Sequence, residues 1–292
     1  MTNPPPSIRP LDSALKERLH LRGDNPMSLR LIRGLINGSD AISRWARGRP
    51  FLALKESEDL LVQLHGLKGR DLVQAVLAHN GGTQLTPLGL ENVPPNGPVI
   101  IAATHPTGMF DFVAHAGALL EKRPDLKVVA NLEVQKFLGP EIIVPVSIDK
   151  QNRAKSGTET ALAMQHHLQA NGALLIFGSG RVPDQRRGAL IEPEWRRGAS
   201  SVSETTQAPI IPAGLNARNS GTYYKLRAIA RFFSGGNDNF GAMIGSLRYT
   251  AELLEKLGGA HEVRYGAPLP PGTDPKTIQS LAEGLFPDLY SN

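Results

Sequence analysis

Pro98-Val-Ile-Ile-Ala-Ala-Thr-His-Pro-Thr-Gly-Met-Phe-Asp111 is the stretch of this chain that decides its fold class. It opens with a short apolar run and breaks at His105-Pro106, as a buried strand does where it leaves a sheet. The pattern turns apolar again near Asp111, which predicts that a helix begins there. In open α/β sheets, ligands bind outside the carboxyl ends of the strands, so we expect His105 at the mouth of such a sheet.

His105 and Asp111 together have the chemistry of a general base. A histidine titrates near neutral pH, and an adjacent carboxylate fixes its tautomer and stabilises its protonated form. The pair is therefore a candidate for taking a proton from an alcohol. A histidine followed within a turn by an aspartate also occurs as a capped helix beside a solvated histidine, and the pair alone leaves that interpretation open.

Two further apolar runs end in loops of small or polar residues. They are Gly172-Ala-Leu-Leu-Ile-Phe-Gly-Ser-Gly-Arg181 and Gln207-Ala-Pro-Ile-Ile-Pro-Ala-Gly214. Across the chain, we expect strands at residues 99–103, 127–130, 142–146, 174–177, 210–213 and 262–265. Helices are expected between them, at 112–122, 158–170, 196–205, 223–233 and 243–257. This alternation predicts an α/β fold with a mixed sheet flanked by helices.

The three blocks at 104–111, 177–181 and 209–214 stand in the order found in the glycerolipid acyltransferase superfamily, which the chain resembles over roughly residues 85–270. Members of that superfamily acylate lysolipids. In them a strand ends in Asn-His or Thr-His with an acidic residue shortly downstream. A Phe-Pro-Glu-Gly-Thr-Arg loop and a Pro-Ile-(Ile/Val)-Pro-Val strand follow. The strength of the resemblance lies in the ordered set.

Two departures point to a particular branch. Five residues separate His105 from Asp111, where the commonest pattern has four. The second block has Ser179 in place of the glutamate, and its arginine, Arg181, is displaced by one position. Both features are similar to the haemolysin-like or lyso-ornithine-lipid acyltransferase branch, and Asn216-Ala-Arg-Asn-Ser220 is similar to the Gly-Arg-Asn-Ser of that branch.

The resemblance implies a role for each block. His105 would be the general base and Asp111 its orienting carboxylate. The residues implied in substrate binding are Thr107, Gly108, Gly178, Ser179, Gly180, Arg181, Arg218 and Asn219. Purely structural interpretations of these residues stay open. The amides of residues 107 and 108 serve as oxyanion donors or only shape the turn. Residues 178–180 form an ordinary turn, and Arg218-Asn219 caps a helix.

The implied function is that of an O-acyltransferase of membrane lipid biosynthesis. It would move a fatty acyl chain from acyl carrier protein or coenzyme A to the hydroxyl of a lysolipid, either a lyso-ornithine-type aminolipid or a lysophospholipid. No cofactor is expected besides the acyl thioester, and no metal, because the adjacent His166 and His167 would point about 100° apart on a helix. The alternative is a non-catalytic lipid- or acyl-carrier-binding protein on the same scaffold.

The amino-acid composition argues against several other classes of protein. The chain has 292 residues, of which 40% are hydrophobic, and its net charge is +5. It contains no cysteine, which excludes a thiol nucleophile and a disulfide framework. We expect no nucleic-acid partner, because only 5% of residues are aromatic and no binding motif is recognisable. A serine hydrolase is disfavoured because Phe177 occupies the first glycine position of Gly-x-Ser-x-Gly.

We expect an N-terminal helical region at 1–84, with a proline-rich start at 1–10, and an acyltransferase domain at 85–292. Residues 27–49 contain five arginines, one acid and Trp45, as in an amphipathic helix that rests on anionic lipid headgroups. Packing of this helix on the catalytic domain is the other interpretation. Glycines 34 and 38 are predicted to break it, with Ser39-Asp40 capping the second piece.

No secretion signal opens the sequence, and no apolar run reaches the ~20 residues needed to span a bilayer. We therefore expect the protein to lie at the cytoplasmic, inner face of the membrane and to bind the membrane surface peripherally.

Overall fold

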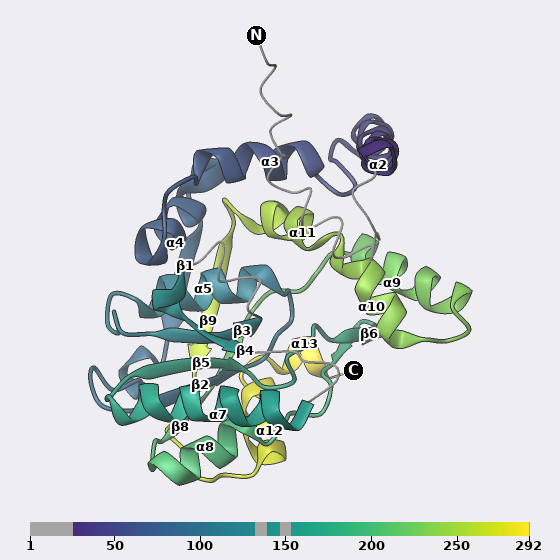
Figure 1. Ribbon diagram of the computed structural model, residues 1–292. Helices are drawn as coiled ribbons and strands as arrows, with labels where there is room; N and C mark the ends of the chain where they lie inside the picture. The colour runs from purple at the N-terminus through teal and green to yellow at the C-terminus, as the bar shows by residue number, and fades with distance from the viewer. Residues whose placement is uncertain (1–25, 132–138, 147–152, 292) are drawn as a thin grey trace. The chain divides into compact units, whose positions relative to one another are not determined.

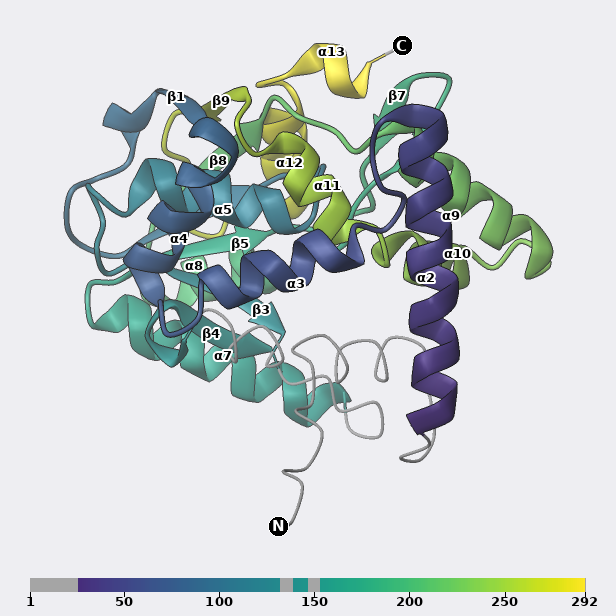
Figure 2. The same ribbon diagram turned by 90° about the horizontal axis from the view of Figure 1, so that it is seen from above.

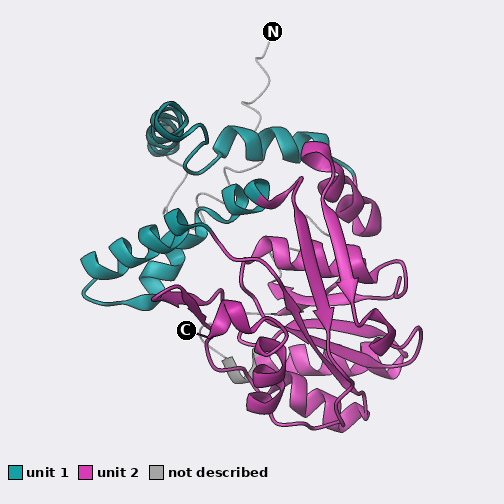
Figure 3. Cartoon of the chain, turned by 180° about the vertical axis from the view of Figure 1, so that it is seen from behind, with its two compact units in different colours: residues 1–66, 220–255 teal, residues 67–219, 256–292 magenta. Residues whose placement is uncertain are grey.

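The structure is a computed structural model that describes residues 26–131, 139–146 and 153–291. The proline-rich start predicted at 1–10 lies outside the described residues. The chain divides into two compact units, coloured separately in Figure 3. We call residues 1–66 with 220–255 the helical unit, and residues 67–219 with 256–292 the sheet unit. Each unit combines two separate segments of the sequence, whereas the sequence predicted two continuous regions that meet at residue 84.

The sheet unit contains a seven-stranded mixed sheet among its described residues, in the order β1-β9-β8-β2-β5-β3-β4. Its strands are β1 (Gln84–Leu88), β2 (Val99–Ala103), β3 (Lys127–Asn131), β4 (Ile143–Val146), β5 (Ala173–Phe177), β8 (Ile210–Leu215) and β9 (Ala260–Tyr265). The five strands from β8 to β4 run parallel, β9 is antiparallel to β8, and β1 is parallel to β9. The predicted fold class, a mixed α/β sheet flanked by helices, is confirmed.

Strand β2 lies between β5 and β8 and is the central strand of the seven-stranded sheet. All five of its residues are buried. A strand covered on both faces is expected to be apolar throughout and not alternating, which explains the uninterrupted run before His105.

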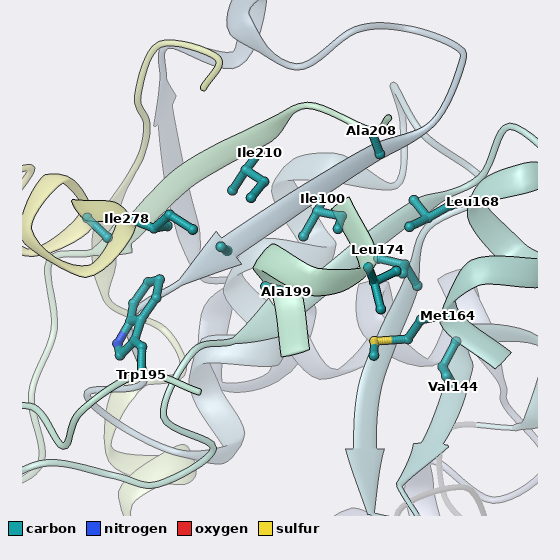
Figure 4. Close-up of a cluster of buried hydrophobic side chains, with 13 residues drawn as sticks. Ile100, Val144, Met164, Leu168, Leu174, Trp195, Ala199, Ala208, Ile210 and Ile278 are labelled. Atoms are coloured by element: carbon teal, nitrogen blue, oxygen red, sulfur yellow. The ribbon is translucent and has the colours of Figure 1, made fainter. Parts of the chain in front are cut away.

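Helices cover both faces of the sheet. They are α4 (Gly69–Ala78), α5 (Met109–Leu119), α7 (Arg153–Gln169), α8 (Gly198–Thr206), α12 (Pro275–Glu283) and α13 (Pro287–Tyr290), with short 3₁₀ turns at His79–Gly81, Leu90–Asn92 and Pro140–Ile142. Figures 1 and 2 show α5 and α7 on opposite faces. The core on the α7 side is shown in Figure 4 and includes Ile100, Leu168, Leu174, Ile210 and Ile278. Each fully buried Leu or Ile of this kind contributes roughly 1.5–3 kcal/mol of transfer free energy.

Besides the C-terminal helices α12 and α13, the sequence patterns did not reveal two β elements. Strand β1 contains Pro87 and pairs only with β9, which fits the restriction of proline to edge strands. The other is a hairpin of β6 (Asp184–Arg186) and β7 (Ala189–Ile191). Its two-residue turn places Arg187 and Gly188 at φ of 49° and 96°, as the preferred hairpin turns require.

The helical unit contains α2 (Pro26–Arg47), α3 (Leu54–Gln63), α9 (Gly221–Phe233), α10 (Asp238–Ser246) and α11 (Tyr249–Lys256), whose last residue belongs to the sheet unit. The helix predicted at 243–257 is thus two helices. The predicted break inside 27–49 is also wrong, because α2 is a single helix of 22 residues, visible as such in Figure 2.

Asp40 explains why α2 is not broken. Its buried carboxylate accepts hydrogen bonds from the backbone N–H groups of Leu52 and Leu54, at 2.6 and 3.0 Å, so it stabilises the connection into α3 instead of starting a helix of its own. Gly34 and Gly38 inside α2 each lower the stability of the helix by about 0.5–1 kcal/mol relative to alanine, and the helix forms despite this. Among the residues described, no helix combines the length and apolar composition that crossing a bilayer requires.

Candidate active site

The carboxyl ends of three neighbouring parallel strands meet at one edge of the sheet. The loop after β2 carries His105, the loop after β5 carries residues 178–181, and the loop after β8 carries residues 216–219. The sheet order therefore brings the three sequence blocks to the same edge. That edge is where open α/β sheets bind their ligands.

His105 and Asp111 form a dyad at this edge. The Nδ1 atom of His105 lies 2.9 Å from Oδ2 of Asp111, which is ion-pair distance. The aspartate side chain is completely buried, whereas 18% of the histidine side chain remains exposed. Because Nδ1 faces the carboxylate, Nε2 is the ring nitrogen left to meet a substrate.

Asp111 is held by its own helix N-terminus. Its carboxylate accepts from the N–H of Thr107 at 2.9 Å, from the Thr107 hydroxyl at 2.5 Å and from the N–H of Gly108 at 2.9 Å. Gly108 has φ of 83°, a conformation that other residues rarely adopt. These donors fix the position of the carboxylate in the first turn of α5. The amides of residues 107 and 108, candidate oxyanion donors by sequence, are thus both directed at Asp111 in this structure.

Two aromatic neighbours complete the surroundings of the dyad. The ring of Phe177 stacks on that of His105, with centroids 4.2 Å apart and planes inclined by 22°. Sequence reasoning gave Phe177 no contact with the histidine. His115, one turn beyond Asp111, is buried, and burial lowers its pKa to about 4. It is therefore neutral at pH 7, and its Nδ1 lies 3.4 Å from the Tyr265 hydroxyl.

The loop after β5 is built on contacts with Trp195 and Glu192. A Cβ atom on Gly178 would lie 2.0 Å from Cδ2 of Trp195, so the indole packs directly on this glycine. Ser179 is buried, and its hydroxyl lies 2.9 Å from Oε1 of the buried Glu192. Gly180 provides the positive φ of the turn, 64°. The sequence gave no signal for Glu192 and Trp195, which lie beyond an unrecognised hairpin.

Replacing Gly178 with alanine is expected to destabilise the sheet unit by about 1–3 kcal/mol, because the new methyl group overlaps the Trp195 ring. Thermal unfolding measures this, with Gly198→Ala as the matched control. Gly198 also lies outside the positive-φ glycines and has no atom near its would-be Cβ, so its substitution should stay within about 0.5 kcal/mol. Equal stability of both variants would contradict the packing role of Gly178.

The predicted polar residues at this edge differ in their surroundings. Arg181 and Arg218 are exposed, and Arg218 donates to the carbonyl of Gly188 in the β6–β7 hairpin at 3.3 Å. Asn219 is buried, and its Oδ1 accepts from the Lys256 ammonium at 3.2 Å. The two arginines are therefore open to an anionic ligand, while Asn219 faces the protein. In the part of the chain that is described, no cluster of His, Cys, Asp and Glu side chains is suited to a metal ion.

The structure thus combines a mixed α/β sheet with a histidine–aspartate dyad at its carboxyl edge. Such a dyad is suited to taking a proton from a hydroxyl group. Residues 85–216 match the family model described as Acyltransferase. The matched segment is somewhat less than half of the chain, and over it the chain is similar to that family.

Two curated relatives are each named lyso-glycine lipid O-acyltransferase. The protein from Bacteroides thetaiotaomicron is 23% identical over 184 residues, which cover 62% of this chain and 64% of the relative. The protein from Phocaeicola vulgatus is 24% identical over 191 residues, 65% of each chain. The chain thus spans slightly less than two thirds of either relative. A similar solved structure is the 1-acyl-sn-glycerophosphate (LPA) acyltransferase PlsC from Thermotoga maritima, with a TM-score of 0.47 and 14% identity over 82% of this chain and 83% of that one.

Proposed function

We propose that this chain is an O-acyltransferase that moves a fatty acyl chain from a thioester to the hydroxyl of a lysolipid. The observation that carries the proposal is the dyad, in which Nδ1 of His105 lies 2.9 Å from the buried Asp111 carboxylate. The names of the two relatives support a lipid acceptor with a free hydroxyl.

The dyad can perform the transfer without a nucleophile of its own. Nε2 of His105 takes the proton of the acceptor hydroxyl while its oxygen attacks the thioester carbonyl. The tetrahedral oxyanion then collapses, breaks the C–S bond and expels a thiolate, which takes the proton back from the imidazolium. Asp111 holds the ring in one tautomer and stabilises its positive charge between the two steps.

For the acceptor, we propose an acylated amino-acid lipid in preference to lysophosphatidic acid. Both curated relatives are named for such a lipid. Ser179, which is buried against Glu192, also stands where the commonest family pattern has glutamate, so the contacts of that pattern with an acceptor phosphate do not carry over. Arg181 and Arg218 are exposed at the same edge and would bind an anionic headgroup. The donor is acyl carrier protein or coenzyme A, both of which carry the acyl chain as a thioester.

A competition assay tests this choice. The purified full chain is given labelled acyl carrier protein or acyl-coenzyme A together with equal amounts of lyso-glycine lipid, lyso-ornithine lipid and lysophosphatidic acid, and lipid products are identified by mass spectrometry. We expect the amino-acid lipids to be acylated. Acylation of lysophosphatidic acid alone would overturn the acceptor assignment and leave the transferase intact.

We further propose that the protein binds peripherally to an anionic membrane surface, at the cytoplasmic face. Helix α2 exposes an apolar stripe on one side, made of Met27, Leu31, Leu35, Ile42 and Trp45. Trp45 is 89% exposed, and Arg30 and Arg47 of the same helix are also exposed. A cationic helix with an exposed apolar stripe is typical of an interfacial element.

Helix α9 of the same unit has a similar surface. It contains no acidic residue, and it exposes Phe232 by 78% and Phe233 by 81% beside Ile229. Exposed adjacent phenylalanines would add apolar area to a membrane contact.

Replacing Phe232 and Phe233 with serine should weaken binding to vesicles of phosphatidylglycerol and phosphatidylcholine by at least tenfold, because burying each ring is worth roughly 1.5–3 kcal/mol. The matched control is Leu162→Ser on α7, where the leucine is 58% exposed. Binding is followed by quenching of Trp45 with brominated lipid, since the only other tryptophan, Trp195, is buried. Equal binding by the wild type and the double variant would contradict a role for α9.

A further inference from the structure

We propose that Glu192 is a positioning residue of the reaction, which fixes the loop at 178–181 by donating a hydrogen bond to Ser179. The inference rests on the proposed function, because the loop it fixes lies beside the dyad. Glu192 directly follows β7, and Ser179 lies two residues beyond the end of β5, 13 positions earlier in the chain.

The contacts around Ser179 are all hydrogen bonds at once when Glu192 carries a proton. The Ser179 Oγ atom lies 2.9 Å from the Arg181 carbonyl oxygen, 3.2 Å from the Arg181 N–H and 2.9 Å from Oε1 of Glu192. A hydroxyl has a single proton to donate. If the Ser179 hydroxyl donates its proton to the Arg181 carbonyl, which can only accept, the contact between Ser179 and Glu192 is a hydrogen bond when Glu192 is the donor. With an ionised Glu192 the hydroxyl donates to Oε1 instead, and its contact with the Arg181 carbonyl is then left without a proton.

The surroundings of Glu192 favour this neutral form. Burial raises its pKa to about 8, and the nearby carboxylates of Glu283 on α12 and Asp111 on α5 act in the same direction. A hydrogen bond donated to the carboxylate by Ser179 or by the Trp195 side chain acts in the opposite direction, because it favours the ionised form. Tyr290 of α13 also faces this carboxyl, and its own pKa is raised, chiefly by burial. At pH 7 Glu192 is therefore mostly protonated and can donate.

The sign of the pH dependence follows from this shift. The pKa of Glu192 is higher in the folded chain than in the unfolded chain, so its contribution to stability declines as the pH rises from the ordinary range of glutamate towards about 8. Above that pH the acid ionises, loses its donor proton and is repelled by Asp111 and Glu283. The loop should then loosen.

A loosened loop affects the dyad through two neighbours. Phe177, whose ring stacks on His105, immediately precedes the loop, and Trp195 packs on Gly178 within it. Glu192 thus acts on the reacting histidine through Ser179 and the backbone of this loop. A displacement of about 1 Å at a reacting group can cost 10²-fold in rate, so a residue that touches no substrate can still control turnover.

Glutamine and alanine at position 192 separate this role from a purely structural one. Glu192→Gln keeps a donor for Ser179 and cannot ionise, so it should retain at least a third of the wild-type kcat at pH 7 and lose the decline in kcat above about pH 8. Glu192→Ala should lower kcat about 10–100-fold at pH 7, with a smaller change in KM. Glu194→Gln, an exposed acid two residues away, is the matched control and should behave as wild type. An unchanged alkaline decline in Glu192→Gln would overturn the proposal.

A second readout needs no substrate. In a Trp45→Phe background, Trp195 is the remaining tryptophan, and its indole packs on Gly178. Its fluorescence should change with a midpoint near pH 8, and the change should be absent when Glu192 is glutamine. A transition that persists in the glutamine variant would contradict the proposal. A glutamate-dependent transition in a protein without transferase activity would support the role of Glu192 and count against the proposed function alone.

Discussion

Replacing His105 with alanine is expected to lower the rate of acyl transfer by about 10²–10⁴-fold, the usual contribution of a positioned general base. The histidine side chain is mostly buried and stacks on Phe177, so its removal should lower the thermal unfolding midpoint by a few degrees while the chain stays folded. The measurement is the initial rate of product formation at saturating acceptor, with circular dichroism as a check on the fold.

The chain provides a matched control for this variant. His166 is an exposed histidine on α7, and its replacement with alanine should leave the rate unchanged. If His105→Ala stays folded and as active as His166→Ala, the dyad is not the base of the reaction.

Asp111→Asn is expected to lower kcat by a similar 10²–10⁴-fold with little change in KM. An amide oxygen in the place of Oδ2 can still accept from the N–H groups of Thr107 and Gly108 and still faces Nδ1 of His105, but the side chain is uncharged. The imidazolium that forms during the reaction is then left without its counter-charge. The same substitution in the Ser-His-Asp triad costs about 10⁴ in kcat.

A milder change at the same carboxylate provides the comparison. Thr107→Val keeps the charge of Asp111 and removes only the hydroxyl donor, so its effect should be that of one hydrogen bond to a charged group, about 1.5–3 kcal/mol in stability. Comparable activity of Asp111→Asn and wild type would show that the aspartate serves only as a helix cap.

The parts of the fold that follow from local patterns were predictable. Strand β2 had the predicted bounds, 99–103, because a strand buried on both faces is apolar throughout. That β2, β5 and β8 are neighbours is seen only in the structure, because β3 and β4 lie between β2 and β5 in the sequence. Strand β1 and the β6–β7 hairpin were missed because a proline and a charged turn obscure their short patterns.

In the candidate site, too, the local contacts were predictable from the sequence and the long-range contacts were not. The His105–Asp111 contact spans six residues and is encoded by one loop, so the sequence carries it. The contact of Ser179 with Glu192 crosses a hairpin, and no periodicity reports such a pairing. Only the structure explains why residue 178 is a glycine, because the indole of Trp195 occupies the space that a side chain would need.

The central claim is that this chain transfers an acyl group by means of His105, and one measurement tests it most directly. The purified wild type and the His105→Ala variant are incubated with acyl carrier protein bearing a labelled acyl chain and with lyso-glycine lipid, and the lipids are analysed by mass spectrometry. We expect a product heavier by one acyl group with the wild type and at least 10²-fold less of it with the variant. Binding of donor and acceptor by both proteins without product from either would contradict it and favour a non-catalytic lipid-binding protein.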